Sequence, residues 1–435
     1  MSQLSPRRGR AVARFVATLA AAALAGGGLV ACGDSDSGSD GDQVTLRFSW
    51  WGSDSRAQLT TQAIKQFEQK FPNIKVQTFY AAYAPYWQKI ATETAGANAP
   101  DVIQMDYRYL SEYGQRNALL DLGQHASALP TTGVEPAIAT SGTIDGKLVA
   151  VPFGQNTMAI AVDNTALEGL GLKAPEIGTW AEFAAWAKEV NEKSDGKVYG
   201  VSDMGYAEDI FELWLMQNGK SLFTTDGKLG FTEADLTAFW TLWQDMVKSG
   251  AATPAEISNQ YDGTTAKSAL VQGKSTAEFI FDNTLGGTQA AMKNKLSLVA
   301  FPTDGSSSGM YYKPTMLLSA TSQSKHPAEA AQLINYLIND EAAGKVLGVD
   351  RGLPANTTVR SAVVSGISDP ASSEVVRYEE SVKGNLAKTP AAPPKGDGEI
   401  KNLMQSAYQG VTSGQTPIAT AVSTFYQQAQ QAIGA

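Results

Sequence analysis

Cysteine and histidine are scarce in this sequence of 435 residues. Cys32 is the single cysteine, and His125 and His326 are the two histidines. One thiol cannot form an internal disulfide, and so few cysteines and histidines nearly exclude zinc sites and Ser-His-Asp catalysis. A glycine-rich Lys-Ser/Thr loop for phosphates is also missing. We therefore expect no metal and no cofactor, and binding by carboxylates, amides and aromatic rings, which 8 Trp, 15 Tyr and 15 Phe supply.

The chain starts with the composition of a signal peptide. Four arginines lie within 7–14, an apolar run follows at 15–30, and small residues precede Cys32. The basic and apolar segments are typical of export, and the junction is similar to the lipobox of bacterial lipoproteins. We expect cleavage before Cys32, lipidation of Cys32 and anchoring at the extracellular face of the cell membrane. An uncleaved transmembrane anchor is the alternative, and Arg7 with Arg8 leaves both general and twin-arginine export open.

An acidic low-complexity segment follows the cysteine. Residues 33–42 contain only Gly, Ser and Asp, so they cannot pack and are predicted to act as a flexible tether. Loss of the leader takes the formal charge from −9 to −13. This acidic balance argues against nucleic acid as a partner. About 400 mature residues exceed what one core usually holds, so two lobes are expected.

The hydrophobic pattern alternates between strand and helix periods. Strands are predicted at 44–50, 74–80 and 101–105, with helices near 59–71 and 86–94 between them, which is typical of a parallel α/β sheet. After 156 the helices resume. Thr179 and Glu182 form a capping box, Thr232 begins a second helix, and a third begins near Pro327. Their apolar stripes, including Trp186, Trp240 and Trp243, are predicted to be core. The stretch 385–398 is predicted to be a loop, followed by a helix near 416–433.

Six segments in order make the chain resemble the extracellular solute-binding proteins of carbohydrate importers, the group that contains maltose-binding protein. They are the lipobox with its tether, 48–52, 97–102, 146–153, 269–276 and 351–356. The resemblance implies an α/β, two-lobed, periplasmic-binding-protein-like fold of type II, with a hinge and a ligand in the cleft between the lobes. It also implies a monomeric receptor without enzymatic activity. Such a receptor captures a sugar or oligosaccharide by lobe closure and delivers it to the membrane permease of an ABC transporter.

The domain limits follow from the expected crossings near 153–157, 314–318 and 351–356. The predicted division is 1–31 as signal peptide, 32–43 as lipidated cysteine and tether, 44–155 with 318–350 as lobe one, and 156–317 with 351–435 as lobe two.

A sugar needs aromatic planes for its apolar faces and carboxylates or amides for its hydroxyls. In open α/β sheets a ligand sits beyond the carboxyl ends of the strands, so strand-end residues are the candidates. Three of the candidates could have a structural role instead. Asp106 could cap a helix, Arg351 could pair with groups near Asp350, and Trp214 could pack in the core. The predicted ligand-binding residues are Trp51, Gly52, Asp106, Tyr107, Gln155, Asn156, Trp214, Asp282, Asn283, Tyr312 and Arg351.

Two alternatives stay open at this point. The same fold could bind another solute, such as a peptide or polyamine. An exported glycoside hydrolase or lyase could use Asp106 and Asp282 as its acid and base, provided that the two carboxyls lie about 5–9.5 Å apart.

Overall fold

A computed structural model describes residues 43–176, 178–261 and 263–434. The signal peptide, Cys32 and the tether lie outside these residues. Within them, no helix is both long and apolar enough to span a bilayer.

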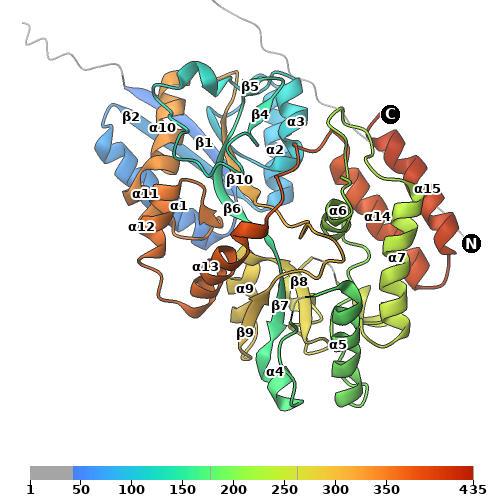
Figure 1. Cartoon of the computed structure of the whole chain (residues 1–435). Helices are drawn as coiled ribbons and strands as arrows, with labels where there is room; N and C mark the ends of the chain where they lie inside the picture. Colours follow the sequence, from blue (N-terminus) through green and yellow to red (C-terminus); the bar gives the residue numbers. More distant parts are fainter. Residues whose placement is uncertain (1–42, 177, 262, 435) are drawn as a thin grey trace, which may run out of the picture. The chain divides into compact units, whose positions relative to one another are not determined.

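The larger sheet has six strands in the order β11-β6-β10-β3-β1-β2. Strand β1 runs parallel to β2 and β3, whereas β10 runs antiparallel to β3 and β6, and β11 antiparallel to β6. The predicted strand-helix-strand pattern at the start of the chain is confirmed, because β1, α1, β2, α2 and β3 follow one another there (Figure 1). The elements are β1 (Val44–Trp51), α1 (Asp54–Lys70), β2 (Ile74–Ala81), α2 (Tyr83–Ala95), β3 (Val102–Met105), α3 (Tyr107–Gln115), β6 (Val151–Asn156), β10 (Lys313–Ala320), α10 (Pro327–Asn339), α11 (Glu341–Leu347), β11 (Leu353–Pro354) and α12 (Thr357–Val364).

The smaller sheet has three strands in the order β8-β7-β9, and both of its pairings are antiparallel. The helices expected after residue 156 are present, and the capping box of Thr179 and Glu182 opens α5 as predicted. A short hairpin of β4 and β5 stands apart from both sheets. The remaining elements are β4 (Thr143–Ile144), β5 (Lys147–Leu148), β7 (Met158–Asp163), α4 (Asn164–Gly169), α5 (Trp180–Lys193), α6 (Glu208–Gln217), α7 (Glu233–Lys248), α8 (Ala255–Ser258), β8 (Ala277–Phe281), α9 (Leu285–Ala290), β9 (Leu296–Val299), α13 (Pro370–Val382), α14 (Asp397–Thr412) and α15 (Ile418–Ala432), with the 3-10 turn η3 (Asp282–Thr284) after β8.

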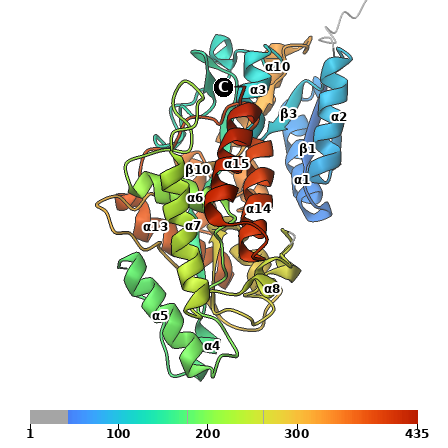
Figure 2. The same cartoon turned by 90° about the vertical axis from the view of Figure 1, so that its right-hand side faces the viewer.

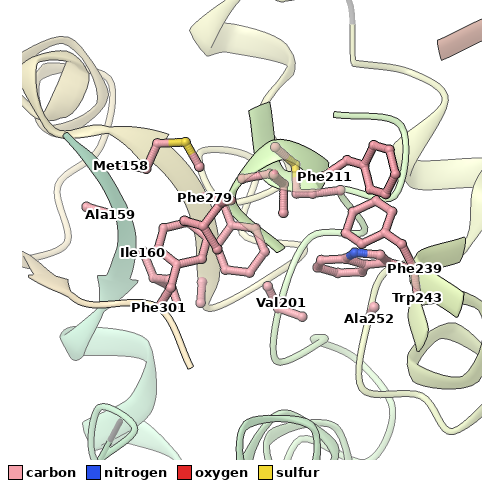
Figure 3. Close-up of a cluster of buried hydrophobic side chains, with 14 of the residues drawn as sticks. Met158, Ala159, Ile160, Val201, Phe211, Phe239, Trp243, Ala252, Phe279 and Phe301 are labelled. Atoms are coloured by element: carbon pink, nitrogen blue, oxygen red, sulfur yellow. The ribbon is translucent and has the colours of Figure 1, made fainter. Parts of the chain in front are cut away.

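Each sheet has its own hydrophobic core. Trp240 and Trp243 are fully buried against the smaller sheet, and Trp186 packs partly buried against the same cluster, so the prediction that these stripes are core is confirmed. Figure 3 shows Trp243 of α7 close to Phe239 and Phe211, with Phe279 of β8 to their left in the same cluster. Burial of such large apolar rings stabilises this half of the chain.

The chain passes between the two sheets with very little connecting sequence. Thr157 is the single residue between β6 of the larger sheet and β7 of the smaller one, and Figure 1 shows the two strands following each other.

The predicted lobe limits at 318 and 351 stay a prediction. Strand β10 pairs in the larger sheet from Lys313 onward, and α12 packs on α11. These contacts favour extending lobe one by 313–317 and by α12.

The last two helices belong to the smaller sheet's half of the chain. Helices α14 and α15 pack on each other, and α15 packs on α7 (Figure 2). The Tyr408 hydroxyl of α14 lies 3.0 and 3.2 Å from the two oxygens of the buried Asp203 carboxylate and shares its one proton with them, and the Gly205 amide donates a further hydrogen bond at 3.0 Å. Burial nevertheless raises the pKa of Asp203 from 3.8 to about 7.

This raised pKa predicts a specific pH dependence of stability. Between pH 4 and 7 the folded protein keeps the Asp203 proton that the unfolded chain releases, so stability is lost as the pH rises through this window. Asp203→Asn removes this dependence. The melting temperature of the variant, relative to the parent, is expected to rise from pH 4 to pH 7, measured by differential scanning calorimetry. Asp195→Asn, at an exposed position, is the control; a constant difference between the Asp203 variant and the parent would contradict the assignment.

Candidate functional site

A cavity of about 530 Å³ lies where the strand ends of both sheets meet. We call it the central cleft. The cavity is lined by residues from α2, α3 and the cap between β3 and α3, from the end of β6, from α6, from β8 and η3, from the start of β10 and from α14. The polar side chains used below are Asp106, Asn156, Asp209, Asn283, Lys313 and Lys401. Both sheets therefore present hydrogen-bonding groups to one space.

Asp106 is held at the edge of the cleft by its role as a helix cap. It follows β3 directly, and its carboxylate accepts the Arg108 amide at 2.9 Å as the N-cap of α3. The Tyr83 hydroxyl donates to its other oxygen at 3.0 Å. Both alternatives considered for Asp106 are therefore present together, because the capping carboxylate also lines the cavity.

Two amides meet between the sheets. Asn156 ends β6, Asn283 lies in η3 after β8, and the Asn156 Nδ2 donates to the Asn283 Oδ1 at 2.9 Å. Both side chains line the central cleft. An amide pair of this kind can exchange its mutual bond for bonds to ligand hydroxyls, since each amide both donates and accepts.

Lys313 and Asp209 form an ion pair of 2.8 Å on the cleft wall, and the ammonium lies 4.8 Å from the Phe281 ring centroid. Burial would raise the pKa of Asp209, but Lys313 and Lys401 outweigh it and lower this pKa to about 2. The pair was not predicted as part of the site. Its one sequence signal is that Lys313 follows the aromatic pair at 311–312 close to an expected crossing.

A second cavity of about 510 Å³ adjoins the central cleft. The two cavities share Asp209, Phe281, Thr284 and Lys401. The aromatic rings of Tyr206 and Tyr261, whose centroids are 6.2 Å apart, also line the second cavity. Polar groups and aromatic walls therefore continue beyond the central cleft.

Trp51 and Gly52 lie behind the cleft wall. Trp51 is 8% exposed, and its ring packs against Tyr83, Tyr86 and Trp87 at centroid distances of 5.5, 5.4 and 5.9 Å. Gly52 abuts the Arg56 side chain, which a Cβ would meet. The aromatic ring that lines the cleft at this point is Tyr83, which is 39% exposed. Nothing in the sequence separates Tyr83 from its neighbours, because 83–87 has the composition of a packing segment.

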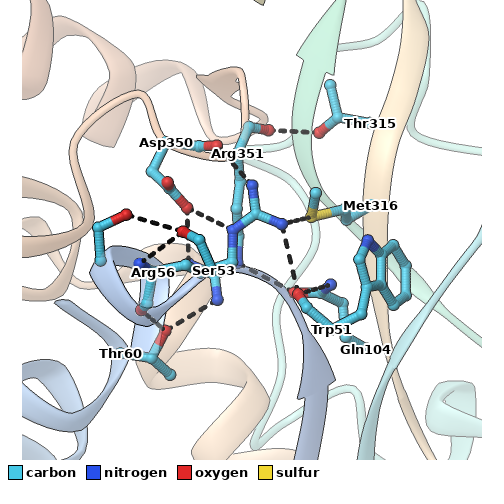
Figure 4. A network of polar contacts seen from close by, with 10 residues as sticks. Trp51, Ser53, Arg56, Thr60, Gln104, Thr315, Met316, Asp350 and Arg351 are labelled. Carbon is cyan, nitrogen blue, oxygen red and sulfur yellow. Dashed lines mark hydrogen bonds and ion pairs between the residues drawn. The ribbon is translucent and has the colours of Figure 1, made fainter. Parts of the chain in front are cut away.

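Arg351 lies in a buried polar network rather than in the central cleft. Its guanidinium donates to the Gln104 Oε1 at 3.0 Å and to the Thr60 Oγ1 at 2.8 Å, and Arg56 pairs with Asp350 at 2.6 Å (Figure 4). Burial lowers the pKa of Arg351 to about 9. This arrangement favours a structural role for Arg351. Its side chain links the turn that precedes β11 to β3 through Gln104 and to α1 through Thr60.

Gln155 and Asp282 are completely buried and do not line the central cleft. Gln155 donates to the Glu379 carboxylate at 2.6 Å, and Asp282 accepts the Thr157 amide at 3.1 Å. Each is adjacent in sequence to a cleft residue. Gln155 precedes Asn156 in strand β6, where successive side chains point to opposite faces, and Asp282 precedes Asn283 in the turn η3.

The other three predicted residues are dispersed. Tyr107 lines the cleft and donates its hydroxyl to the Pro390 carbonyl at 2.7 Å. Tyr312 is 7% exposed and lines a different cavity that also contains Glu379. Trp214 is half-buried against Phe211 and Phe239 on the core side of α6. The structure thus brings Asp106, Tyr107, Asn156 and Asn283 together and leaves the other seven outside the central cleft.

An ionic cluster beside the cleft joins the two halves of the chain. Arg108 of α3 pairs with Asp397 of α14 and, at 3.4 Å, with Glu208 of α6. Burial, together with the nearby Asp397 carboxylate, raises the pKa of Glu208 to about 8. The positive charge of Arg108 therefore partly neutralises the buried carboxyl groups of Asp397 and Glu208.

Removing this cation is predicted to destabilise the fold. Arg108→Met keeps the aliphatic stem but leaves Asp397 and Glu208 buried without their partner, which is expected to cost roughly 3 kcal/mol of unfolding free energy, measured by urea denaturation. Arg116→Met on the same helix breaks an exposed pair with Glu112 and is expected to cost under about 1 kcal/mol. Equal losses would show that the Arg108 cluster has no special role.

Comparison with known proteins identifies the family. The family model described as bacterial extracellular solute-binding protein matches residues 62–372. The chain belongs to this family. The resemblance predicted from the sequence is thereby confirmed for solute-binding proteins.

Two relatives with curated descriptions match parts of the binding protein. A probable ABC transporter-binding protein of Deinococcus radiodurans is 25% identical over 268 residues, which is 59% of this chain and 62% of the relative. An uncharacterized lipoprotein of Streptomyces antibioticus is 26% identical over 152 residues, 34% of each chain. The chain thus spans less than two thirds of the length of these relatives.

Solved structures confirm the two-lobed α/β fold. An extracellular solute-binding protein of family 1 from Alicyclobacillus acidocaldarius is 30% identical, with a TM-score of 0.74 over 90% of this chain and 99% of that chain. A periplasmic oligogalacturonide binding protein from Yersinia enterocolitica is 22% identical, with a TM-score of 0.76 over 90% and 99%. At that identity the second likeness shows the fold alone.

Proposed function

We propose that the chain is the lipid-anchored receptor of an ABC importer and captures a sugar or oligosaccharide in the central cleft. The observation that carries the proposal is the meeting of Asn156 and Asn283 from the two sheets, in a cavity that the Asp106 carboxylate and the Tyr83 ring also line. Amides and a carboxylate match hydroxyl edges, and an exposed ring matches the apolar face of a sugar. The names of the Deinococcus and Yersinia proteins agree with this proposal.

The mechanism that fits this site is capture by closure. A sugar that contacts groups from both sheets binds the closed arrangement more tightly than the open one, so it shifts the population toward closure. The single-residue connection between β6 and β7 offers a place for the bending. The loaded protein then delivers the sugar to the permease, and the importer's ATPase supplies the energy.

The enzyme alternative has little support from the geometry. Asp106 lines the central cleft, but Asp282 is completely buried and does not. A glycosidase needs both carboxyls on either side of one bond. A non-sugar solute remains the competing ligand class.

A panel titration tests the function directly. The protein is titrated with mono-, di- and oligosaccharides, a peptide and a polyamine, with tryptophan fluorescence and melting temperature as readouts and chromatography to detect products. We expect saturable binding and a raised melting temperature with a sugar, and no product. Binding of the peptide or polyamine alone would refute the sugar class, and cleavage of a glycan would refute the receptor.

The Asp106 carboxylate is predicted to contribute directly to affinity. Asp106→Asn keeps a good N-cap residue but removes the charge that strengthens bonds to hydroxyls, so the dissociation constant for the sugar found in the panel is expected to rise about tenfold. Glu112→Gln, on the same helix but outside the central cleft, is the control and should bind as the parent does. Unchanged affinity of Asp106→Asn would remove Asp106 from the site.

The anchor is tested through the only thiol. In cells, Cys32→Ala is expected to move the protein from the membrane fraction to the soluble fraction or medium, because the lipid can no longer be attached. Mass spectrometry of the parent should show a lipidated amino-terminal Cys32. Retention of the variant in the membrane with an uncleaved leader would favour the transmembrane alternative.

A further inference from the structure

Glu278 is a buried acid on the wall of the second cavity. It lies in strand β8, is 6% exposed, and lines the second cavity but not the central cleft. The proposed capture of a sugar in the central cleft does not use it. A buried carboxylate needs hydrogen bonds and a compensating positive charge, so both are sought around this residue.

One carboxylate oxygen of Glu278 is occupied by its own surroundings. The Oε2 atom accepts the Ser268 hydroxyl at 2.6 Å and the Leu270 amide at 3.1 Å. It also lies 3.1 Å from the Ser202 hydroxyl, which donates to it. The Oε1 atom accepts no hydrogen bond from the described residues. The structural role of Glu278 therefore uses one oxygen and leaves the other available in the cavity wall.

Glu278 also differs from the other acids on this wall in having no cation. Glu208 pairs with Arg108, and Asp209 pairs with Lys313. Glu278 forms no ion pair with a lysine or arginine in the part of the chain that the structure describes. Burial raises the pKa of Glu278, although its three hydrogen bonds act in the opposite direction. A positive charge brought into the second cavity would therefore meet an uncompensated carboxyl group.

Aromatic rings form another part of the same wall. Tyr206, Tyr261 and Phe281 line the second cavity, and the centroids of the two tyrosine rings are 6.2 Å apart. The Lys313 ammonium lies 4.8 Å from the Phe281 centroid, so a cation already rests against a ring at the edge of this space. Aromatic faces attract ammonium groups, and a carboxylate binds them through charge-assisted hydrogen bonds.

We propose that the second cavity receives a protonated amino group of the captured solute, bound by the Glu278 Oε1, and that this solute is an amino sugar. The inference rests on the proposed function and adds the class of sugar. A hydroxyl group can also donate to Oε1, but only an ammonium supplies the missing charge as well. The two cavities adjoin, so the hydroxyls of one ligand can lie in the central cleft while its amino group reaches Glu278.

Matched sugars that differ in one group test the inference. The mature protein is titrated calorimetrically with glucosamine, galactosamine and mannosamine, with their parent sugars and with their N-acetyl forms. The di- and trisaccharides of chitosan, cellulose and chitin extend this set, because they share one backbone and carry an amino, hydroxyl or acetamido group. We expect at least one amine to bind about 10- to 100-fold more tightly than both of its neutral counterparts.

A variant assigns this preference to Glu278. Glu278→Gln keeps the size of the side chain and an oxygen for the three hydrogen bonds but removes the charge. The affinity for the amine is expected to fall to that of its neutral counterpart. Glu192→Gln, at an exposed position on α5 where Glu192 pairs with Lys188, is the control and should keep the preference. An undiminished preference in Glu278→Gln would overturn the assignment.

The parent protein decides the matter if the variant fails to fold. Neutral sugars that bind as tightly as their amines would overturn the inference and leave the sugar receptor standing. Binding of no amine in the set would equally overturn it. Spermidine is titrated in parallel, and binding of spermidine without binding of any sugar would refute the proposed function together with the amino-sugar class.

Discussion

The covalent continuity of β6 and β7 is the constraint on which the rest of the structure depends. With Thr157 alone between them, the last residue of one sheet and the first of the other cannot separate. Asn156 is therefore always beside the boundary, and the η3 turn reaches it because β8 pairs with β7 from Met158 onward. The central cleft exists because two independently packed sheets are forced to end at the same point.

Charge in this region is balanced locally rather than spread over the protein. Lys313 is paired with Asp209, and Arg108 with Asp397 and Glu208, so most of the cleft's cations already have carboxylate partners. Such pairs contribute more to fixing the arrangement of α3, α6, α14 and β10 than to net stability. The free energy lost by removing both charges from water cancels much of the free energy gained from their attraction.

The sequence predicted those features that depend on local patterns. The strand and helix order of the first half, the capping box at Thr179 and the buried tryptophans of α7 all follow from short-range periodicity and capping. Four of eleven candidate binding residues line the central cleft, and each lies at a strand end or within two residues of one. Tyr83 and Asp209 were missed because their places depend on how α2 and α6 pack on the sheets, and Lys313 because its place depends on where β10 begins to pair with β6. The same limit applies to Arg351, whose partners Gln104 and Thr60 are remote in sequence.

The Asp106 carboxylate has two roles, since it caps α3 and also lines the central cleft. Asp, Asn, Ser and Thr cap helices well, whereas Ala or large apolar residues cost stability at this position. If ligand preference changes during evolution, substitutions at residue 106 are consequently restricted to these four residue types. Positions such as Thr284 and Lys401, which line the cleft with exposed side chains, can vary more freely and offer the easier route to a new specificity.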